Sequence, residues 1–122
     1  MIVAVFVRRL RPGRTFEDFV EAWDAEQGFG VPTRVFAGVS VEDERDVLTV
    51  GFVDVSAAQL AEGMSSGVAA AEAERHSKID DVIESTELRA FYDLRAERDF
   101  TAAPRPIEPG SAESLLRTLT AG

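Results

Sequence analysis

A chain of 122 residues with 45% hydrophobic and 29% charged residues has the size and composition of one soluble globular domain. It contains no cysteine, which excludes disulfides, thiolate metal sites and a cysteine nucleophile. The formal charge of −9 has the wrong sign for binding phosphate groups, so we expect neither nucleic acid nor an anionic membrane as a partner. With a single histidine and no cysteine, no metal site and no cofactor are expected.

The apolar residues 2–7 predict a strand that continues to residue 9. Charge follows this stretch, at Arg8 and Arg9, instead of preceding it, so it does not have the pattern of a signal peptide. No run reaches the ~18 apolar residues of a membrane-spanning helix. We therefore expect a cytoplasmic protein, and twelve arginines against one lysine are typical of a GC-rich bacterial genome.

The next elements follow from turn and capping signals. Pro12 and Gly13 predict a turn, and Thr15 to Asp18 form a capping-box pattern that begins a helix, which Gly28 ends. Residues 33–41 and 47–55 have the β pattern and are separated by polar residues, which predicts a hairpin.

A second capping-box pattern, Ser56 to Gln59, begins another helix, whose apolar stripe includes Leu60, Met64 and Val68. Residues 86–96 alternate and predict the last strand. The order β-α-β-β-α-β is that of an α+β, ferredoxin-like fold, in which helices cover one face of a four-stranded antiparallel sheet. We expect this domain to span residues 1–100.

Residues 101–122 are predicted to form a Pro-rich C-terminal arm. Three prolines between Ala103 and Gly110 favour an extended linker over a strand, and residues 111–120 predict a short helix. A helix of this length is marginal alone, so its leucines are expected to pack in a groove of the body or of a partner subunit.

Both faces of the predicted sheet are rich in apolar residues, although its helices can cover only one. A hairpin loop of two or four residues would place Val39 opposite Leu48 and leave the smooth, β-branched face of Val3, Val5 and Val7 for the helices. The opposite face, with Phe6, Phe36 and Phe91, would then be the interface of a homodimer. A loop of three or five residues would shift the hairpin register and make this assignment of faces invalid.

With these elements the chain resembles the dimeric α+β barrel superfamily, especially its antibiotic-biosynthesis-monooxygenase-like branch. The resemblance covers residues 1–99 and rests on the opening strand, the Pro12-Gly13 turn, the first helix with Trp23, the hairpin, the second helix and the final strand. It implies two sheets that pair face to face, and a small-molecule cavity in each subunit. Members with haem-degrading activity use an asparagine, and this chain has none.

Several residues are candidates for chemistry. Arg8 lies in a basic cluster with Arg9, Arg11 and Arg14, which either clamps an anion or forms ion pairs at a strand end. His76 is the one side chain whose ordinary pKa suits acid–base work near neutrality, although its position on the second helix also permits simple exposure. The expected site has Arg8 and His76 as catalytic groups and an aromatic wall that would equally serve as core: Phe6, Trp23, Phe36, Phe91 and Tyr92.

Two functions are compatible with these residues. One is a cofactor-independent monooxygenase or isomerase that acts on an aromatic or polyketide-like compound. The other is a non-catalytic ligand-binding or assembly protein of the same fold. Whether polar groups converge in an open cavity distinguishes the two.

Overall fold

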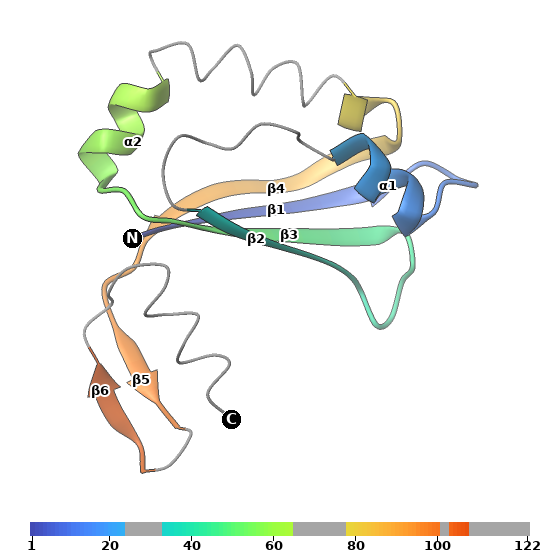
Figure 1. Ribbon diagram of the computed structural model, residues 1–122. Helices are drawn as coiled ribbons and strands as arrows, with labels where there is room; N and C mark the ends of the chain where they lie inside the picture. The colour runs from blue at the N-terminus through green and yellow to red at the C-terminus, as the bar shows by residue number, and fades with distance from the viewer. Residues whose placement is uncertain (24–32, 65–77, 101–102, 108–122) are drawn as a thin grey trace.

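A computed structural model describes residues 1–23, 33–64, 78–100 and 103–107 of the chain. The main sheet has four antiparallel strands in the order β2-β3-β1-β4, and helices α1 and α2 lie on one side of it (Figure 1). The strands are β1 (Ile2–Leu10), β2 (Thr33–Val39), β3 (Asp46–Val53) and β4 (Ile83–Asp93). This α+β arrangement is compatible with the predicted ferredoxin-like plan.

The two helices begin where their capping residues predicted. In α1 (Phe16–Trp23), the backbone N–H of Asp18 donates to Thr15 Oγ1 and the Thr15 N–H donates to Asp18 Oδ2. The same reciprocal pair joins Ser56 and Gln59 ahead of α2 (Ala57–Met64). The predicted end of the first helix at Gly28 and the course of the second beyond Met64 lie outside the described residues.

The turn between β1 and α1 has the geometry that its sequence predicted. Gly13 has a φ of 84°, and the Arg14 N–H donates to the Arg11 carbonyl oxygen. Proline followed by a residue with positive φ is typical of a type II turn, which glycine adopts without strain. The turn therefore directs α1 back over the sheet.

The hairpin between β2 and β3 differs from the prediction by one residue. Val39 lies opposite Val47 instead of Leu48, and the Ser40 N–H donates to the Asp46 carbonyl oxygen, so residues 41–45 form a five-residue loop. Asp43 shapes this loop, because its carboxylate accepts the Arg45 N–H and its carbonyl accepts the Asp46 N–H. The odd loop length turns every β2 side chain to the face opposite the predicted one.

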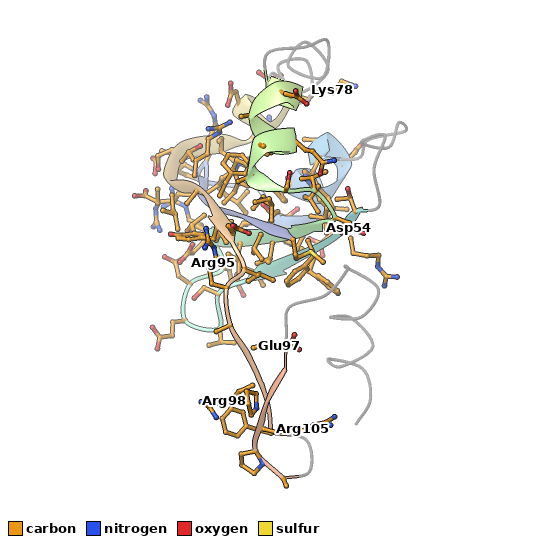
Figure 2. The ribbon with its side chains drawn as sticks, turned by 90° about the vertical axis from the view of Figure 1, so that its left-hand side faces the viewer. Asp54, Lys78, Arg95, Glu97, Arg98 and Arg105 are labelled. Carbon is orange, nitrogen blue, oxygen red and sulfur yellow. The ribbon has the colours of Figure 1, made fainter. Side chains whose placement is uncertain are left out.

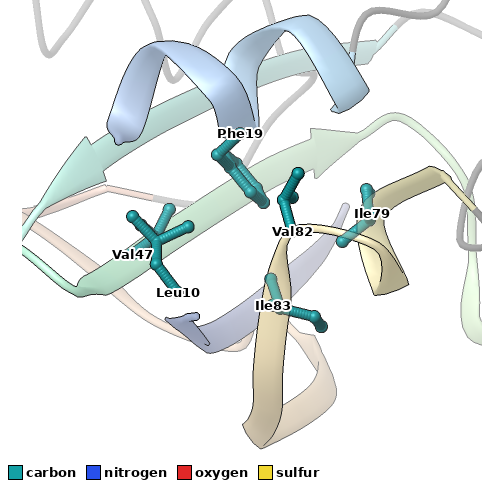
Figure 3. Close-up of a cluster of buried hydrophobic side chains, with 6 residues drawn as sticks. All are labelled: Leu10, Phe19, Val47, Ile79, Val82 and Ile83. Carbon is teal, nitrogen blue, oxygen red and sulfur yellow. The ribbon is translucent and has the colours of Figure 1, made fainter. Parts of the chain in front are cut away.

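The helices also cover the face opposite to the one expected. The buried core lies between α1, the turn before β4 and the side of the sheet that carries Val47 and Leu10 (Figure 3). Small residues on this side, including Ala4, Ala37 and Gly51, leave room for the large aromatic side chains of α1. The β-branched face that was predicted to carry the helices is instead the one on which no described helix lies.

We call this second side of the sheet the apolar face. Register and strand alternation place its residues together. Four of its large side chains are exposed: Phe36, Leu48, Leu88 and Tyr92. The apolar face consists of Val3, Val5, Val7, Phe36, Leu48, Val50, Phe52, Leu88, Ala90 and Tyr92, and the register also places Arg34 and Gly38 on this side.

A second, two-stranded sheet follows β4. In it β5 (Glu97–Asp99) pairs with β6 (Arg105–Ile107), so part of the segment predicted to be a linker forms a strand. Pro106 is tolerated because β6 is an edge strand, where its missing N–H breaks no ladder. The predicted boundary at residue 100 falls between these two strands, and the predicted helix over 111–120 lies outside the described residues.

Candidate functional site

Aromatic rings and guanidinium groups meet on the helix-facing side of the sheet. The rings of Phe6 and Phe91 are in edge-to-face contact, with centroids 5.9 Å apart. The Arg8 guanidinium carbon lies 4.5 Å from the Phe6 centroid and 5.9 Å from that of Phe19 on α1. The Arg89 guanidinium lies 5.0 Å from the Phe91 ring and 5.8 Å from the Phe6 ring. We call these five residues the arginine–phenylalanine cluster.

Arg8 is the buried member of this cluster, with only 4% of its surface exposed. Its Nη1 donates to Thr49 Oγ1 at 3.3 Å, and its charged group lies within cation–π distance of two rings. Such contacts offset part of the cost of taking a guanidinium out of water, because ring faces carry partial negative charge. A buried planar cation among aromatic rings has the chemistry that recognises carboxylate or phenolate groups.

Trp23 continues this aromatic arrangement along α1. Its ring stacks on Phe19 with centroids 6.4 Å apart, and Phe19 in turn stacks on Phe16 at 6.3 Å. Phe19 is fully buried, whereas Phe16 and Trp23 are partly buried against the core. Trp23 is therefore connected to the Arg8 guanidinium only through the Phe19 ring.

The structure divides the residues predicted for the site between the two sides of the sheet. Phe6, Arg8, Phe91 and Trp23 belong to the helix-facing side. Phe36 and Tyr92 lie on the apolar face, where 46% and 54% of their surfaces are exposed, so they do not join Arg8. For Phe36 the cause is the five-residue hairpin loop. His76 lies outside the described residues.

The other arginines at this end of β1 form contacts with nearby loops. Arg9 Nη1 lies 2.9 Å from Asp43 Oδ2, and its Nε lies 3.6 Å from Glu84 Oε2. Hydrogen bonds from the Arg45 N–H and from Arg9 lower the pKa of Asp43, and the bond to Asp43 raises the pKa of Arg9. Arg9 therefore has the strand-end ion pairs expected as the alternative to an anion clamp.

Three residues of this region were not among the predicted site residues: Thr49, Phe19 and Arg89. Strand alternation already indicates that Thr49 and Arg89 share a face with Phe6 and Arg8, and the register confirms it. Their contact with Arg8 or with the rings depends on side-chain rotamers that the sequence does not specify. Phe19 was missed because its position indicated only a core residue of the first helix.

No protein-family model, curated protein or solved structure matches this chain. Within the described ranges, no group of three or more His, Cys, Asp or Glu side chains is placed to hold a metal ion. None of the helices described is long and apolar enough to cross a membrane. The candidate site therefore rests on the geometry of the arginine–phenylalanine cluster itself.

Proposed function

We propose that this protein binds a small planar aromatic anion at the arginine–phenylalanine cluster. The observation that supports this is the buried Arg8 guanidinium, which lies within cation–π distance of the Phe6 and Phe19 rings and donates a hydrogen bond to Thr49. A ligand with an aromatic ring and a carboxylate or phenolate matches both parts of this environment: the rings stack and the charge pairs with a guanidinium. Arg89, which is exposed, supplies a second cation at the Phe6 ring.

Binding can be measured by calorimetric titration with 1-hydroxy-2-naphthoate, which carries a carboxylate and a phenolic hydroxyl on a planar ring system. The uncharged amide of the same compound is the matched ligand control. Trp23 is the only tryptophan of the chain, and its ring stacks on Phe19, so its fluorescence should change when the naphthoate binds. We expect the naphthoate to bind and the amide to bind at least tenfold more weakly.

Two variants test the guanidinium groups separately. Arg89→Gln removes an exposed cation from the cluster, and Arg8→Met removes the buried one while keeping most of its volume. A charged hydrogen bond contributes about 1.5–3 kcal/mol, which corresponds to roughly 10- to 100-fold in affinity. Arg34→Gln, which lies opposite Phe52 on the other side of the sheet, is the matched control and should bind like the wild type. Equal affinities in all four proteins would contradict the proposal.

Catalysis at this site is a second candidate function, as a cofactor-independent monooxygenase or an isomerase. The observation that favours it is the pair of guanidinium groups at the Phe6 ring, since cations stabilise a phenolate and the carbanion conjugated with it. In the oxygenase reaction, a methylene between two aromatic rings and O₂ would give a carbonyl and water. One oxygen atom enters the product, and the other leaves with the two hydrogens.

The oxygenase reaction can be tested by O₂ uptake with anthrone, whose central methylene has this environment. We expect uptake above the spontaneous rate and its loss in Arg8→Met. Uptake that stays at the spontaneous rate, together with naphthoate binding, would leave the non-catalytic ligand-binding function. His76, the expected proton acceptor, is tested by His76→Ala in the same assay.

We also propose that the protein is a homodimer in which two apolar faces pack together, as in an α+β barrel dimer. The exposure of Phe36, Leu48, Leu88 and Tyr92 supports this, because an apolar surface of several adjacent side chains is rare on monomers. Burying one large apolar side chain completely contributes about 1.5–3 kcal/mol, so burying the exposed half of four contributes roughly 3–6 kcal/mol in each subunit.

Sedimentation equilibrium tests the dimer directly. The wild type should show twice the chain mass of 13.3 kDa at micromolar concentration. Leu48→Asp should be monomeric, because it places a charge in the middle of the packed faces. Glu87→Lys is the control, because it changes the charge at an exposed position of β4 that does not belong to the apolar face. This variant should remain dimeric. A monomeric wild type would refute this part of the proposal.

A further inference from the structure

Residues 94–100 and 103–107 form an arm that leaves the sheet at the end of β4. The arm includes β5 and β6, and it begins beside the start of β1, where the Leu94 N–H donates to the Met1 carbonyl oxygen. Figures 1 and 2 both show the arm extending to the side of the sheet opposite α1 and α2. This is the side of the apolar face.

The arm presents an aromatic side chain and cationic groups. Phe100, between the two strands, is 69% exposed. Arg95, Arg98 and Arg105 outnumber the acidic residues Glu97 and Asp99 in the arm, although the chain as a whole carries a charge of −9. The arm thus has a formal charge of +1 (three arginines against two acidic residues) in an acidic protein, with Arg95 paired to Asp93 of β4, and it carries the exposed Phe100 ring directly after β5.

A loop of complementary character lies at the other end of the sheet. The β2–β3 loop, residues 41–45, contains Glu42, Asp43 and Glu44 against one arginine, and Val41 within it is completely exposed. It lies beside the end of β1, since the Leu10 N–H donates to the Arg45 carbonyl oxygen. Figure 1 shows it curving to the same side of the sheet as the arm.

We infer that in the dimer the arm of each subunit packs against the β2–β3 loop of the other, with Phe100 on the partner's Val41 and Arg98 near the partner's Glu42 and Glu44. This rests on the proposed packing of two apolar faces. Two such faces related by a twofold axis, with their strands roughly aligned, allow two arrangements. Either both arms lie at the same end, or each arm lies at the end where the partner has its loop.

Charge and shape favour the second arrangement. If both arms lay at one end, the arginines of the two arms would face each other, and the two acidic loops would meet at the other end. With arms and loops exchanged, opposite charges meet at both ends. Val41 and Phe100, the two most exposed large hydrophobic side chains among the described residues, would then also cover each other.

The arm and the loop of one chain are too far apart to contact each other. They lie beside opposite ends of β1, whose nine residues span about 27 Å at roughly 3.4 Å per residue. A disulfide requires Cα atoms within about 7 Å. A covalent bond between the two positions therefore has to join two chains.

The native chain contains no cysteine, so introduced cysteines give an unambiguous test. Val41→Cys and Phe100→Cys are made as two single variants of the full chain, mixed, allowed to exchange subunits and oxidised mildly. The expected product is a disulfide-linked dimer containing one chain of each variant, and neither variant should form a linked dimer alone. Mass spectrometry of the linked peptides identifies the pair.

The other outcomes refute the inference in different ways. Disulfides formed within each single variant alone would show that the arms lie at the same end. No disulfide in a preparation that sediments as a dimer would show that the arm contacts something other than the partner's loop. If the protein sediments as a monomer, this result refutes the proposed dimer and therefore also the packing of the arm on a partner.

Charge reversal supplies an independent measurement. Arg98→Glu should raise the dimer dissociation constant several-fold, because an exposed ion pair contributes modestly and the twofold axis repeats it. Glu44→Arg alone should act in the same direction, and the double variant should recover affinity. Lys78→Glu reverses a charge outside both the arm and the loop and is the control. Additive losses in the double variant would contradict the pairing.

Discussion

Val47 and Leu48 are consecutive residues of β3 on opposite faces of the sheet, so their replacement by alanine distinguishes the two possible face assignments. Val47 is 1% exposed and belongs to the core with Leu10 and Phe19, whereas Leu48 is 40% exposed on the apolar face. In the structure, the valine change should be the more destabilising, although the leucine change removes one more carbon atom. With the helices on the face predicted from the sequence, this order would be reversed.

The expected magnitudes follow from burial. Val47→Ala removes two buried carbons at about 0.8 kcal/mol each, and an unfilled cavity adds up to about 1 kcal/mol, for a total near 2.5 kcal/mol. Leu48→Ala removes three carbons that are about three-fifths buried beside solvent, which gives about 1.4 kcal/mol without a cavity contribution. With ~2.1 cal/mol/K of unfolding entropy per residue, these values lower Tm by roughly 10 and 5 °C.

Thermal unfolding followed by circular dichroism measures both losses. The measurement should be made at several protein concentrations, because a dimer is stabilised by mass action and the loss at Leu48 should grow with concentration. The loss at Val47 should be visible even at the lowest concentration. A larger loss for Leu48→Ala than for Val47→Ala under dilute conditions would refute the observed face assignment.

Three further expectations concern single positions. Because the pKa of Asp43 lies below its ordinary 3.8 in the folded protein, its stabilisation is complete above that pH and is lost as the pH falls through the folded value; in Asp43→Asn, urea unfolding should lack this acid-dependent loss. Gly13→Ala should cost about 1 kcal/mol in the same assay, because its φ of 84° is strained for alanine although its surroundings are open. Thr15→Ala should also cost about 1 kcal/mol, whereas Thr15→Ser should cost much less.

Local signals predicted the elements of this fold well. The capping pairs at Thr15 and Ser56 and the turn at Gly13 each depend on residues a few positions apart, and each has the predicted geometry. The four strands of the main sheet lie at or within a few residues of their predicted ranges. The pairing of β1 with β3 and β4 also agrees with the alternation of its residues.

The relation of the sheet to its helices was not predictable in the same way. It depended on the length of one hairpin loop, in which the Asp43 carboxylate accepts the Arg45 N–H. It also depended on where Arg8 is buried. An arginine in a strand indicates a solvent-facing side, and only the aromatic rings brought together by α1 and β1 make burial acceptable.

Part of the candidate site was predicted, and the rest was missed because it depends on the hairpin register and on contacts between a strand and a helix. Strand alternation placed Phe6, Arg8 and Phe91 together, and they are together in the structure. Phe36 was assigned to them through the wrong hairpin register, and Tyr92 was included for its aromatic character alone. The contact between Arg8 and Phe19 joins a strand to a helix, and no spacing in the sequence indicates such a pair.

The position of β1 in the middle of the sheet has a consequence for synthesis of the protein. Both neighbours of this strand come later in the chain, and Ile2 pairs with Val53 and with Asp93. On the ribosome, this strand therefore has no hydrogen-bonded edge until β3 is complete at residue 53, and its second edge stays unpaired until β4 is complete at residue 93. Arg8 and Arg9 at its end would then act as gatekeepers, because charges that flank an apolar strand oppose its association with other nascent chains.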